Sequence, residues 1–116
     1  MRILENGILL LNSQLYYDVM RIFTEKPLKL YAESHPDAKT AIQNWVKKVK
    51  ESRLQTLADI KQTFNSVDYI GNQHYVFNIK GNDYRLVVVI QFRSQFVYVR
   101  FIGTHAEYDR IDCSTI

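Results

Sequence analysis

The fold is decided between residues 66 and 103, where the sequence reads SVDYIGNQHYVFNIKGNDYRLVVVIQFRSQFVYVRFIG. This stretch is rich in Val, Ile, Tyr and Phe, and its period-two pattern is typical of strands. Gly71-Asn72 and Gly81-Asn82 interrupt the pattern as hairpin signals, because Gly supplies the positive φ that a type II′ turn needs. Arg93-Ser94-Gln95 makes a third, three-residue turn. The sequence therefore predicts a four-stranded antiparallel meander, with strands at 66–70, 73–80, 83–92 and 96–103.

Helices are predicted upstream of this sheet. Residues 24–35 form the first, with Thr24 as N-cap, and residues 37–52 form the second, because apolar residues recur there every third or fourth position. Trp45 lies in that apolar stripe and is expected in the core. A third helix is predicted at 56–63, a last helical turn at 105–111, and a short strand at 21–23 that joins the sheet. The fold class is thus α+β, with two to three N-terminal helices packed on a four- to five-stranded, mainly antiparallel sheet.

Length and composition indicate one globular domain. The chain has 116 residues, of which 47% are hydrophobic and 13% aromatic, with only four Gly and two Pro, so disorder and fibrous repeats are excluded. Fifteen basic against twelve acidic residues give a net charge of +3, which permits a polyanionic partner without requiring one. The single cysteine, Cys113, excludes an internal disulfide and makes a zinc ligand set improbable.

No membrane or targeting segment is evident. The longest apolar run near the start, Ile8-Leu9-Leu10-Leu11, is far shorter than the roughly 20 residues that span a bilayer. No small-residue cleavage site follows it. We therefore expect a cytoplasmic protein without membrane association.

The length of the Gly81-Asn82 loop fixes the register between the second and third predicted strands. Lys80 then closes the hairpin, and Asn78 lies opposite Arg85. His105 follows the end of the fourth strand, which lies beside Arg85 in the same register. We therefore expect Asn78, Lys80, Arg85 and His105 to converge at one end of one sheet face.

The turn at 93–95 is expected to pair Phe92 with Phe96, which assigns the remaining side chains to the two faces. Arg100 then falls on the face packed against the helices, where we expect it in a buried or edge ion pair. The opposite face is expected to carry smaller residues, Val76, Val87, Val89, Val97 and Val99. The face against the helices is expected to be large and apolar, with Ile70, Tyr75, Phe77, Ile79, Tyr84, Leu86, Val88, Ile90, Phe92, Phe96, Tyr98 and Ile102.

The polar group at the end of the sheet suits metal-free cleavage of RNA, in which the substrate's own 2′-hydroxyl is the nucleophile. Arg85 would clamp the phosphate, because guanidinium is always charged and can bind two oxygens at once. His105 suits acid or base chemistry near neutral pH, and Tyr108, one turn further, could donate a hydrogen bond or proton, or stack on a base. Asn78 and Lys80 would bind RNA. No residues have metal-ligand spacing, so no metal and no cofactor is expected.

Structural roles explain the same three residues about equally well at this point. Arg85 could form a surface ion pair with Asp83 or Asp109. His105 could cap the last helical turn, and Tyr108 could simply pack.

Two segments resemble the HigB family of bacterial toxins: HYVFNIKGNDYRLVVVI at 74–90 and YVRFIGTHAEYDRI at 98–111. The upstream run at 32–38, Trp45 and the run at 58–61 are similar to the helical half of the same family. The resemblance covers about residues 20–116, which we expect to be the toxin domain. Residues 1–19 lie outside it as an N-terminal extension. An upstream choice of start codon explains the extension most simply, with Met20 as the functional start, and an added strand or an antitoxin-contacting arm is the alternative.

The resemblance implies a RelE-like fold and ribosome-dependent cleavage of messenger RNA. It also implies a HigA-type antitoxin with a helix-turn-helix, so that operator DNA is contacted only through the antitoxin. The segments 84–87 and 103–105 are similar to places where RelE-like toxins keep phosphate-binding basic residues, and His105 stands where some relatives carry Arg. His105 is accordingly either a proton carrier or a phosphate contact.

Two other functions remain open from the sequence. One is a non-catalytic RNA- or ribosome-binding module, in which Arg85, Lys80 and the lysines of the 37–52 helix only hold phosphate. The other is an interaction role, in which the valine-rich sheet face is an antitoxin groove whether or not the protein cuts RNA.

Overall fold

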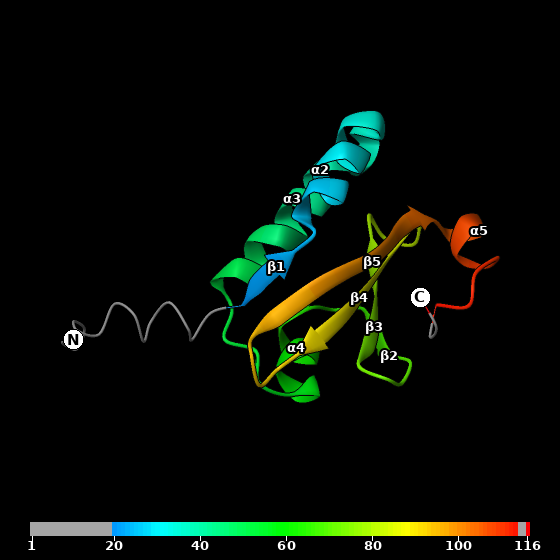
Figure 1. Cartoon of the computed structure of the whole chain (residues 1–116). Helices are drawn as coiled ribbons and strands as arrows, with labels where there is room; N and C mark the ends of the chain where they lie inside the picture. Colours follow the sequence, from blue (N-terminus) through cyan, green and yellow to red (C-terminus); the bar gives the residue numbers. More distant parts are fainter. Residues whose placement is uncertain (1–19, 114–115) are drawn as a thin grey trace.

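The computed structural model describes residues 20–113 and residue 116, which form helices packed on one five-stranded sheet (Figure 1). The predicted α+β architecture is confirmed. The elements in chain order are β1 (Arg21–Phe23), α2 (Glu25–Ser34), α3 (Pro36–Glu51), α4 (Leu57–Thr63), β2 (Val67–Tyr69), β3 (His74–Ile79), β4 (Tyr84–Gln91), β5 (Phe96–Thr104) and α5 (His105–Tyr108).

The sheet has the strand order β1-β5-β4-β3-β2, so the last four strands form the predicted meander. β1 is the exception, because it pairs parallel to β5, with Arg21 beside Phe96 and Phe23 beside Tyr98. α3 and α4 lie against one face of the sheet, and α5 leaves the end of β5 on the side away from α2 and α3 (Figure 1).

The helices begin where local chemistry favours a start. α4 begins with a capping box, in which the Thr56 hydroxyl accepts from the backbone N–H of Asp59 and the Asp59 carboxylate accepts from that of Thr56. α3 begins with Pro36 in its first turn. Thr24 precedes α2, but its side chain does not cap that helix. Its hydroxyl instead accepts a 3.0 Å hydrogen bond from the backbone N–H of Val99 and so ties the start of α2 to β5.

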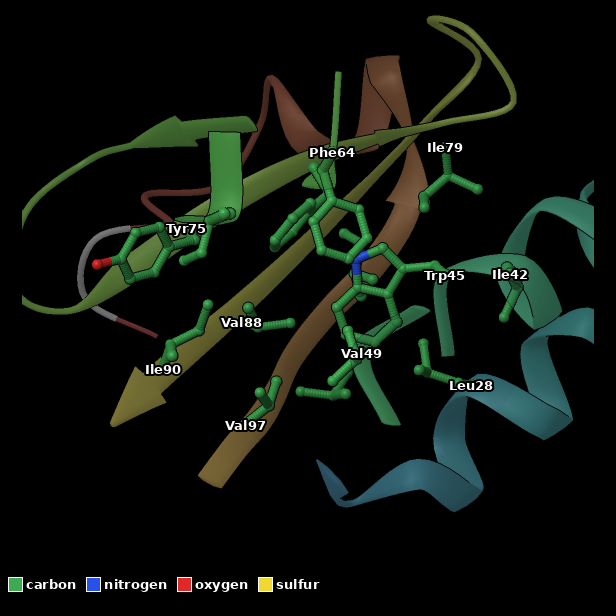
Figure 2. Packing of buried hydrophobic residues seen from close by; sticks show 14 of the residues in the cluster. Leu28, Ile42, Trp45, Val49, Phe64, Tyr75, Ile79, Val88, Ile90 and Val97 are labelled. Atoms are coloured by element: carbon green, nitrogen blue, oxygen red, sulfur yellow. The ribbon is translucent and has the colours of Figure 1, made fainter. Parts of the chain in front are cut away.

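The core lies between the helices and the sheet (Figure 2). Trp45 is at its centre, as expected, with ring centroids 5.4 Å from Phe77 and 6.3 Å from Phe64. Burying each large apolar side chain stabilises the fold by roughly 1.5–3 kcal/mol. Around these rings are further buried residues, among them Leu28, Ile42, Val49, Ile60, Tyr75, Ile79, Leu86, Val88, Ile90 and Val97.

The pairing of β4 with β5 is interrupted by a β-bulge at Arg100. Val87 pairs with Phe101 and Val88 pairs with Val99, so Arg100 is an extra residue in β5. Arg100 is exposed, and its guanidinium carbon lies 5.8 Å from the centre of the Tyr98 ring. The expected buried or edge ion pair of Arg100 is replaced by this stacking.

The predicted faces were wrong for the first half of β5, because the register changes at this bulge. Gln91, and not Phe92, pairs with Phe96, because the turn at 92–95 has four residues and Gln95 adopts a left-handed φ of 62°. An offset of one residue exchanges the two faces. Four residues of β5 therefore lie opposite to the prediction: Val97 and Val99 are buried against the helices, and Phe96 and Tyr98 lie on the other face, which we call the open face.

Candidate functional site

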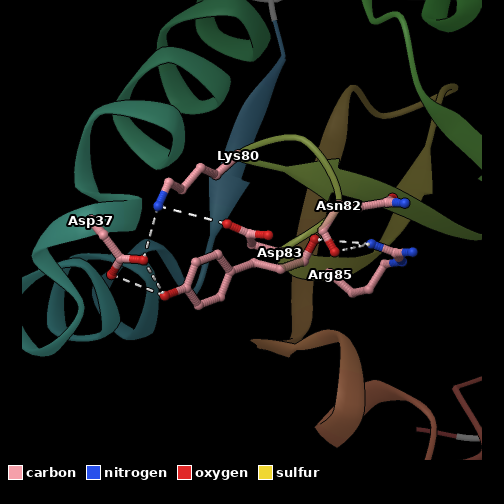
Figure 3. Close-up of polar contacts among 6 residues, drawn as sticks. Asp37, Lys80, Asn82, Asp83 and Arg85 are labelled. Carbon is pink, nitrogen blue, oxygen red and sulfur yellow. Dashed lines mark hydrogen bonds and ion pairs between the residues drawn. The ribbon is translucent and has the colours of Figure 1, made fainter.

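Arg85 and Asn78 lie directly opposite each other on β4 and β3, as the hairpin register predicted. The Arg85 side chain points away from α2 and α3 (Figure 3), and its Nη1 donates to the backbone oxygen of Asn82 at 3.2 Å. The Asn78 amide donates to the hydroxyl of Ser66. The rigid ladder between β3 and β4 therefore fixes the base of both side chains on the open face.

Tyr108 packs against Arg85 from α5. The guanidinium carbon of Arg85 lies 5.9 Å from the centre of the Tyr108 ring, within the range of a cation–π contact. A hydrogen bond joins Sγ of Cys113 and the Tyr108 hydroxyl at 3.3 Å. This contact, together with burial, raises the pKa of Tyr108 to about 12, so its phenol stays protonated at neutral pH. Tyr108 can therefore act as a hydrogen-bond donor beside the guanidinium.

His105 is the first residue of α5, and a capping box places it there. The Thr104 hydroxyl accepts from the backbone N–H of Glu107, and the Glu107 carboxylate accepts from that of Thr104 at 2.8 Å, so Thr104 and not His105 caps this turn. The backbone N–H of His105 donates to the backbone oxygen of Asp83 at 3.1 Å, which anchors α5 to the β3–β4 turn. The helix start thus holds His105 beside the strand that carries Arg85.

The His105 ring is paired with Asp109, four residues later. Its Nδ1 lies 3.0 Å from Asp109 Oδ2, and the side chain is 47% exposed. Because Nδ1 is held by the carboxylate, Nε2 is the ring atom that can exchange a proton with a substrate. The i, i+4 spacing is the sequence signal that could have identified this pair.

Lys80 does not join the open face. Its ammonium lies 3.2 Å from Asp37 of α3 and 3.6 Å from Asp83 (Figure 3). Lys80 adopts a left-handed φ of 54°, as Gly81 does with 64°, so the strand has already ended and the alternation of faces does not extend to Lys80. The expected convergence is therefore reduced to Asn78, Arg85 and the α5 residues.

Asp37 is the residue that sequence analysis missed, because it lies 43 positions before Lys80. Its carboxylate also accepts a hydrogen bond from the Tyr84 hydroxyl, which lies 2.7 and 2.9 Å from the two carboxylate oxygens. These contacts lower the pKa of the Asp37 carboxyl, with Tyr84 as the largest cause and Lys80 next. The same hydrogen bond raises the pKa of Tyr84 to about 12. Asp37, Lys80 and Tyr84 thus form a polar clamp between α3 and the hairpin.

The two carboxylates that the sequence analysis offered as ion-pair partners of Arg85, Asp83 and Asp109, hold other partners. Asp83 pairs with Lys80, and Asp109 pairs with His105. The hydrogen bonds of Arg85 go to backbone oxygens, which carry no net charge. These contacts favour the interpretation that Arg85 binds an anion over the interpretation that it forms a surface ion pair with Asp83 or Asp109.

In the part of the chain that the structure describes, no group of three or more His, Cys, Asp or Glu residues could hold a metal ion. Nor does any helix among residues 20–113 have the length and apolar character needed to cross a membrane.

Most of the chain that carries this site matches a known protein family. Residues 38–111 match the family model described as HigB_toxin, the RelE-like toxic component of a toxin-antitoxin system. The chain belongs to the HigB toxin family. The matched range contains Asn78, Arg85, His105 and Tyr108, so the open-face site lies wholly within the HigB domain.

Curated HigB relatives extend the match over most of the chain. It is 37% identical over 93 residues to the mRNA interferase toxin HigB of Escherichia coli strain K12, which is 78% of this chain and 88% of that protein. The same values hold for the mRNA interferase HigB of Shigella flexneri. An mRNA interferase HigB of Escherichia coli O6:H1 is 28% identical over 94 residues, 79% of this chain and 91% of that protein.

Proposed function

We propose that this HigB-family protein is the toxin of a type II toxin-antitoxin pair and arrests translation by cutting messenger RNA. Its relatives carry the name mRNA interferase. The observation that carries the proposal is the placement of Arg85, whose guanidinium packs on Tyr108 while Asp83 and Asp109 are engaged elsewhere. A cation that is held in place without a carboxylate partner is suited to bind phosphate.

The proposed reaction uses the 2′-hydroxyl of the substrate as nucleophile and no metal ion. The 2′-oxygen forms a bond to phosphorus, the bond from phosphorus to the 5′-oxygen breaks, and one proton leaves the 2′-oxygen while another reaches the 5′-oxygen. Nε2 of His105 is placed to carry one of these protons. Arg85 stabilises the charge that develops on the phosphate, and the Tyr108 phenol donates a hydrogen bond to it. Asn78 contacts the strand from β3.

Membership in a toxin family implies an antitoxin, and we propose a HigA-type helix-turn-helix protein for this role. Through that partner alone the toxin would reach operator DNA. We further propose that the messenger RNA is cut on the ribosome, in the cytoplasm. The identification of the neighbouring gene, and its ability to rescue growth, would test the pairing.

The role of Arg85 is tested by Arg85→Ala, with Arg93→Ala as a matched control that removes the same charge from an exposed turn. We expect Arg85→Ala to lower the cleavage rate by roughly a hundredfold or more, as for other electrostatic donors, and to abolish growth arrest. Arg93→Ala should remain toxic. A folded, fully toxic Arg85→Ala variant, judged by its melting curve, would show that the site is wrongly placed.

The chemistry is tested by the products and by chelation. Cleavage should persist in EDTA and should leave a 2′,3′-cyclic phosphate or 3′-phosphate with a 5′-hydroxyl. Loss of activity in EDTA, or products with a 5′-phosphate, would refute the metal-free route. Binding of RNA without any cleavage would indicate a non-catalytic RNA-binding module instead.

A further inference from the structure

The open face of the sheet carries a partly exposed aromatic patch far from Arg85, at the β1–β5 edge. We define this aromatic patch as Phe23, Phe96 and Tyr98. The ring centroids of Phe23 lie 4.6 Å from Phe96 and 5.1 Å from Tyr98, and Phe23 is 42% exposed. Exposed clusters of large aromatic side chains mark binding surfaces more often than isolated apolar residues do.

The patch and the Arg85 site lie on one face, because of the bulge at Arg100. Tyr98 pairs with Val89, and Arg85 lies four residues before Val89 on the same strand, so both point to the same side. Four residues of strand span roughly 13 Å, a distance that a few nucleotides can cover. Phe101, half-buried and paired with Val87, lies between them on β5.

The part of the open face on β3 and β4 that lies beyond Asn78 and Arg85 is covered, whereas the patch at the β1–β5 edge is accessible. Val76 and Val87 on β3 and β4 are buried. His74 of β3 is also buried, and its Nε2 lies 2.9 Å from the backbone oxygen of Ile116, so Ile116 lies against this half of the face. β1 and β5 lie at the other edge (Figure 1).

The charges around the patch suit a polyanion. The guanidinium carbon of Arg21 lies 5.6 Å from the centre of the Phe96 ring, and that of Arg100 lies 5.8 Å from Tyr98. β1, β4 and β5 contain no acidic residue in the ranges that the structure describes. Glu25, which follows β1, is paired with Lys50 at 2.8 Å. Aromatic rings next to arginines are a combination that binds single-stranded nucleic acid.

We propose that the aromatic patch is a stacking platform for unpaired bases of the RNA strand whose phosphate is bound at Arg85. This inference rests on the proposed function for its substrate, single-stranded RNA, and adds the place where bases beside the cleaved bond are held. Stacking tolerates any base, because every base has a π-face. The patch therefore contributes affinity and direction to the strand, and cleavage remains with the Arg85 site.

The test measures binding of the full chain to a fluorescein-labelled 2′-O-methyl oligoadenylate, which lacks the nucleophile and so is not cut. Phe23→Leu and Tyr98→Leu keep apolar volume but remove the ring. Tyr69→Leu is the control, because Tyr69 is an aromatic residue of similar exposure on β2, at the opposite edge of the sheet. An abasic oligomer of the same length reports phosphate binding alone.

We expect Phe23→Leu and Tyr98→Leu each to weaken binding of the oligoadenylate between about fivefold and a hundredfold, the range for lost base stacking. Binding of the abasic oligomer should not change, and Tyr69→Leu should bind as the parent does. Equal losses for both oligomers, or no loss for either, would overturn the proposal. A change in oligomeric state on gel filtration with unchanged RNA affinity would also overturn it and assign the patch to a protein contact.

The two proposals fail separately in this design. Loss of base-dependent binding in the patch variants, in a chain that does not cut RNA, would refute the proposed cleavage but keep the stacking platform. Normal cleavage of RNA by a chain whose patch variants bind normally would refute the platform alone.

Discussion

At the residue scale, the assignment of acid–base chemistry depends on the contact between His105 and Asp109. We expect His105→Ala to lower kcat by roughly a hundredfold or more if Nε2 moves a proton. Asp109→Ala should have a smaller effect of the same kind, because the ring then loses its orientation but keeps its proton-accepting atom. Single-turnover cleavage, measured beside RNA affinity, separates the two roles. A loss confined to affinity would show that His105 is only a phosphate contact.

Gly103 is a second residue whose environment allows a sharp expectation. A Cβ atom at this position would lie 2.5 Å from Cζ of Phe101 and 2.8 Å from Oε1 of Glu107, so both of these side chains must move. We expect Gly103→Ala to lower the free energy of unfolding by about 1–3 kcal/mol in urea denaturation. Phe101→Leu in the same chain should recover part of the loss, since the shorter side chain removes the closest contact. If the losses in free energy of unfolding of the two single variants simply add in the double variant, this explanation is wrong.

The sequence correctly predicted that Asn78 and Arg85 lie opposite each other, but it wrongly predicted the direction of the Lys80 side chain. A tight turn at Gly81 fixes the pairing of the residues on either side of it, so the Asn78–Arg85 pair follows from local chemistry. The direction of Lys80 depends on Asp37, which only the tertiary fold brings near it. Local patterns predict strand registers, but they do not predict which distant carboxylate attracts a long, flexible side chain.

At the element scale, the polar clamp holds the start of α3 against the β3–β4 hairpin. The Tyr84 and Lys80 contacts lower the pKa of the Asp37 carboxyl below its ordinary value of 3.8. A carboxyl with a lowered pKa in the folded state stabilises the protein above the ordinary value, and this stabilisation is lost as the pH falls through the lowered one. The clamp should therefore weaken only in strong acid.

We expect Asp37→Asn to reduce the melting temperature at neutral pH and to make little difference once the pH is well below 3.8. The raised pKa of Tyr84, about 12, gives the opposite limit, because its contribution is present below pH 10 and is lost as the pH rises through about 12. Tyr84→Phe is the matched variant, since it removes the same hydrogen bond and keeps the ring. Melting temperatures from acid to alkaline pH check both expectations. A constant difference between parent and Asp37→Asn across this range would exclude the clamp as its cause.

The β-bulge shows why elements were predicted better than their faces. The four strands of the meander were predicted near their observed positions, because Val, Ile and aromatic residues define them. The bulge at Arg100 leaves no such mark, since an extra residue has no composition of its own. Its consequence is large, because it moves Phe96 and Tyr98 from the expected core to the open face. The aromatic patch could therefore be recognised only from the structure.

At the scale of the whole molecule, the parallel pairing of β1 with β5 joins the two ends of the described domain. The backbone N–H of Arg21 donates to the backbone oxygen of Gln95 at 2.9 Å. Met20, just before Arg21, is only 2% exposed. Residues from Met20 onward thus belong to the packed structure. The sequence predicted a short strand at this place. Its parallel pairing with β5 depends on how the helices that follow β1 in the chain pack on the sheet, which periodicity does not reveal.

This arrangement leads to an expectation for the first 19 residues, which lie outside the described part of the chain. We expect a protein that begins at Met20 to keep the melting temperature, the growth arrest and the antitoxin rescue of the full chain, because β1 and the buried Met20 side chain are retained. A protein that begins at Glu25 is the control, since it loses Met20 and all of β1. Removal of a buried Met side chain alone costs roughly 2–5 kcal/mol, so this shorter protein should be markedly less stable or fail to fold. If the Met20 protein is insoluble, or folds but is not toxic, residues 1–19 form part of the toxin and the domain does not begin at Met20.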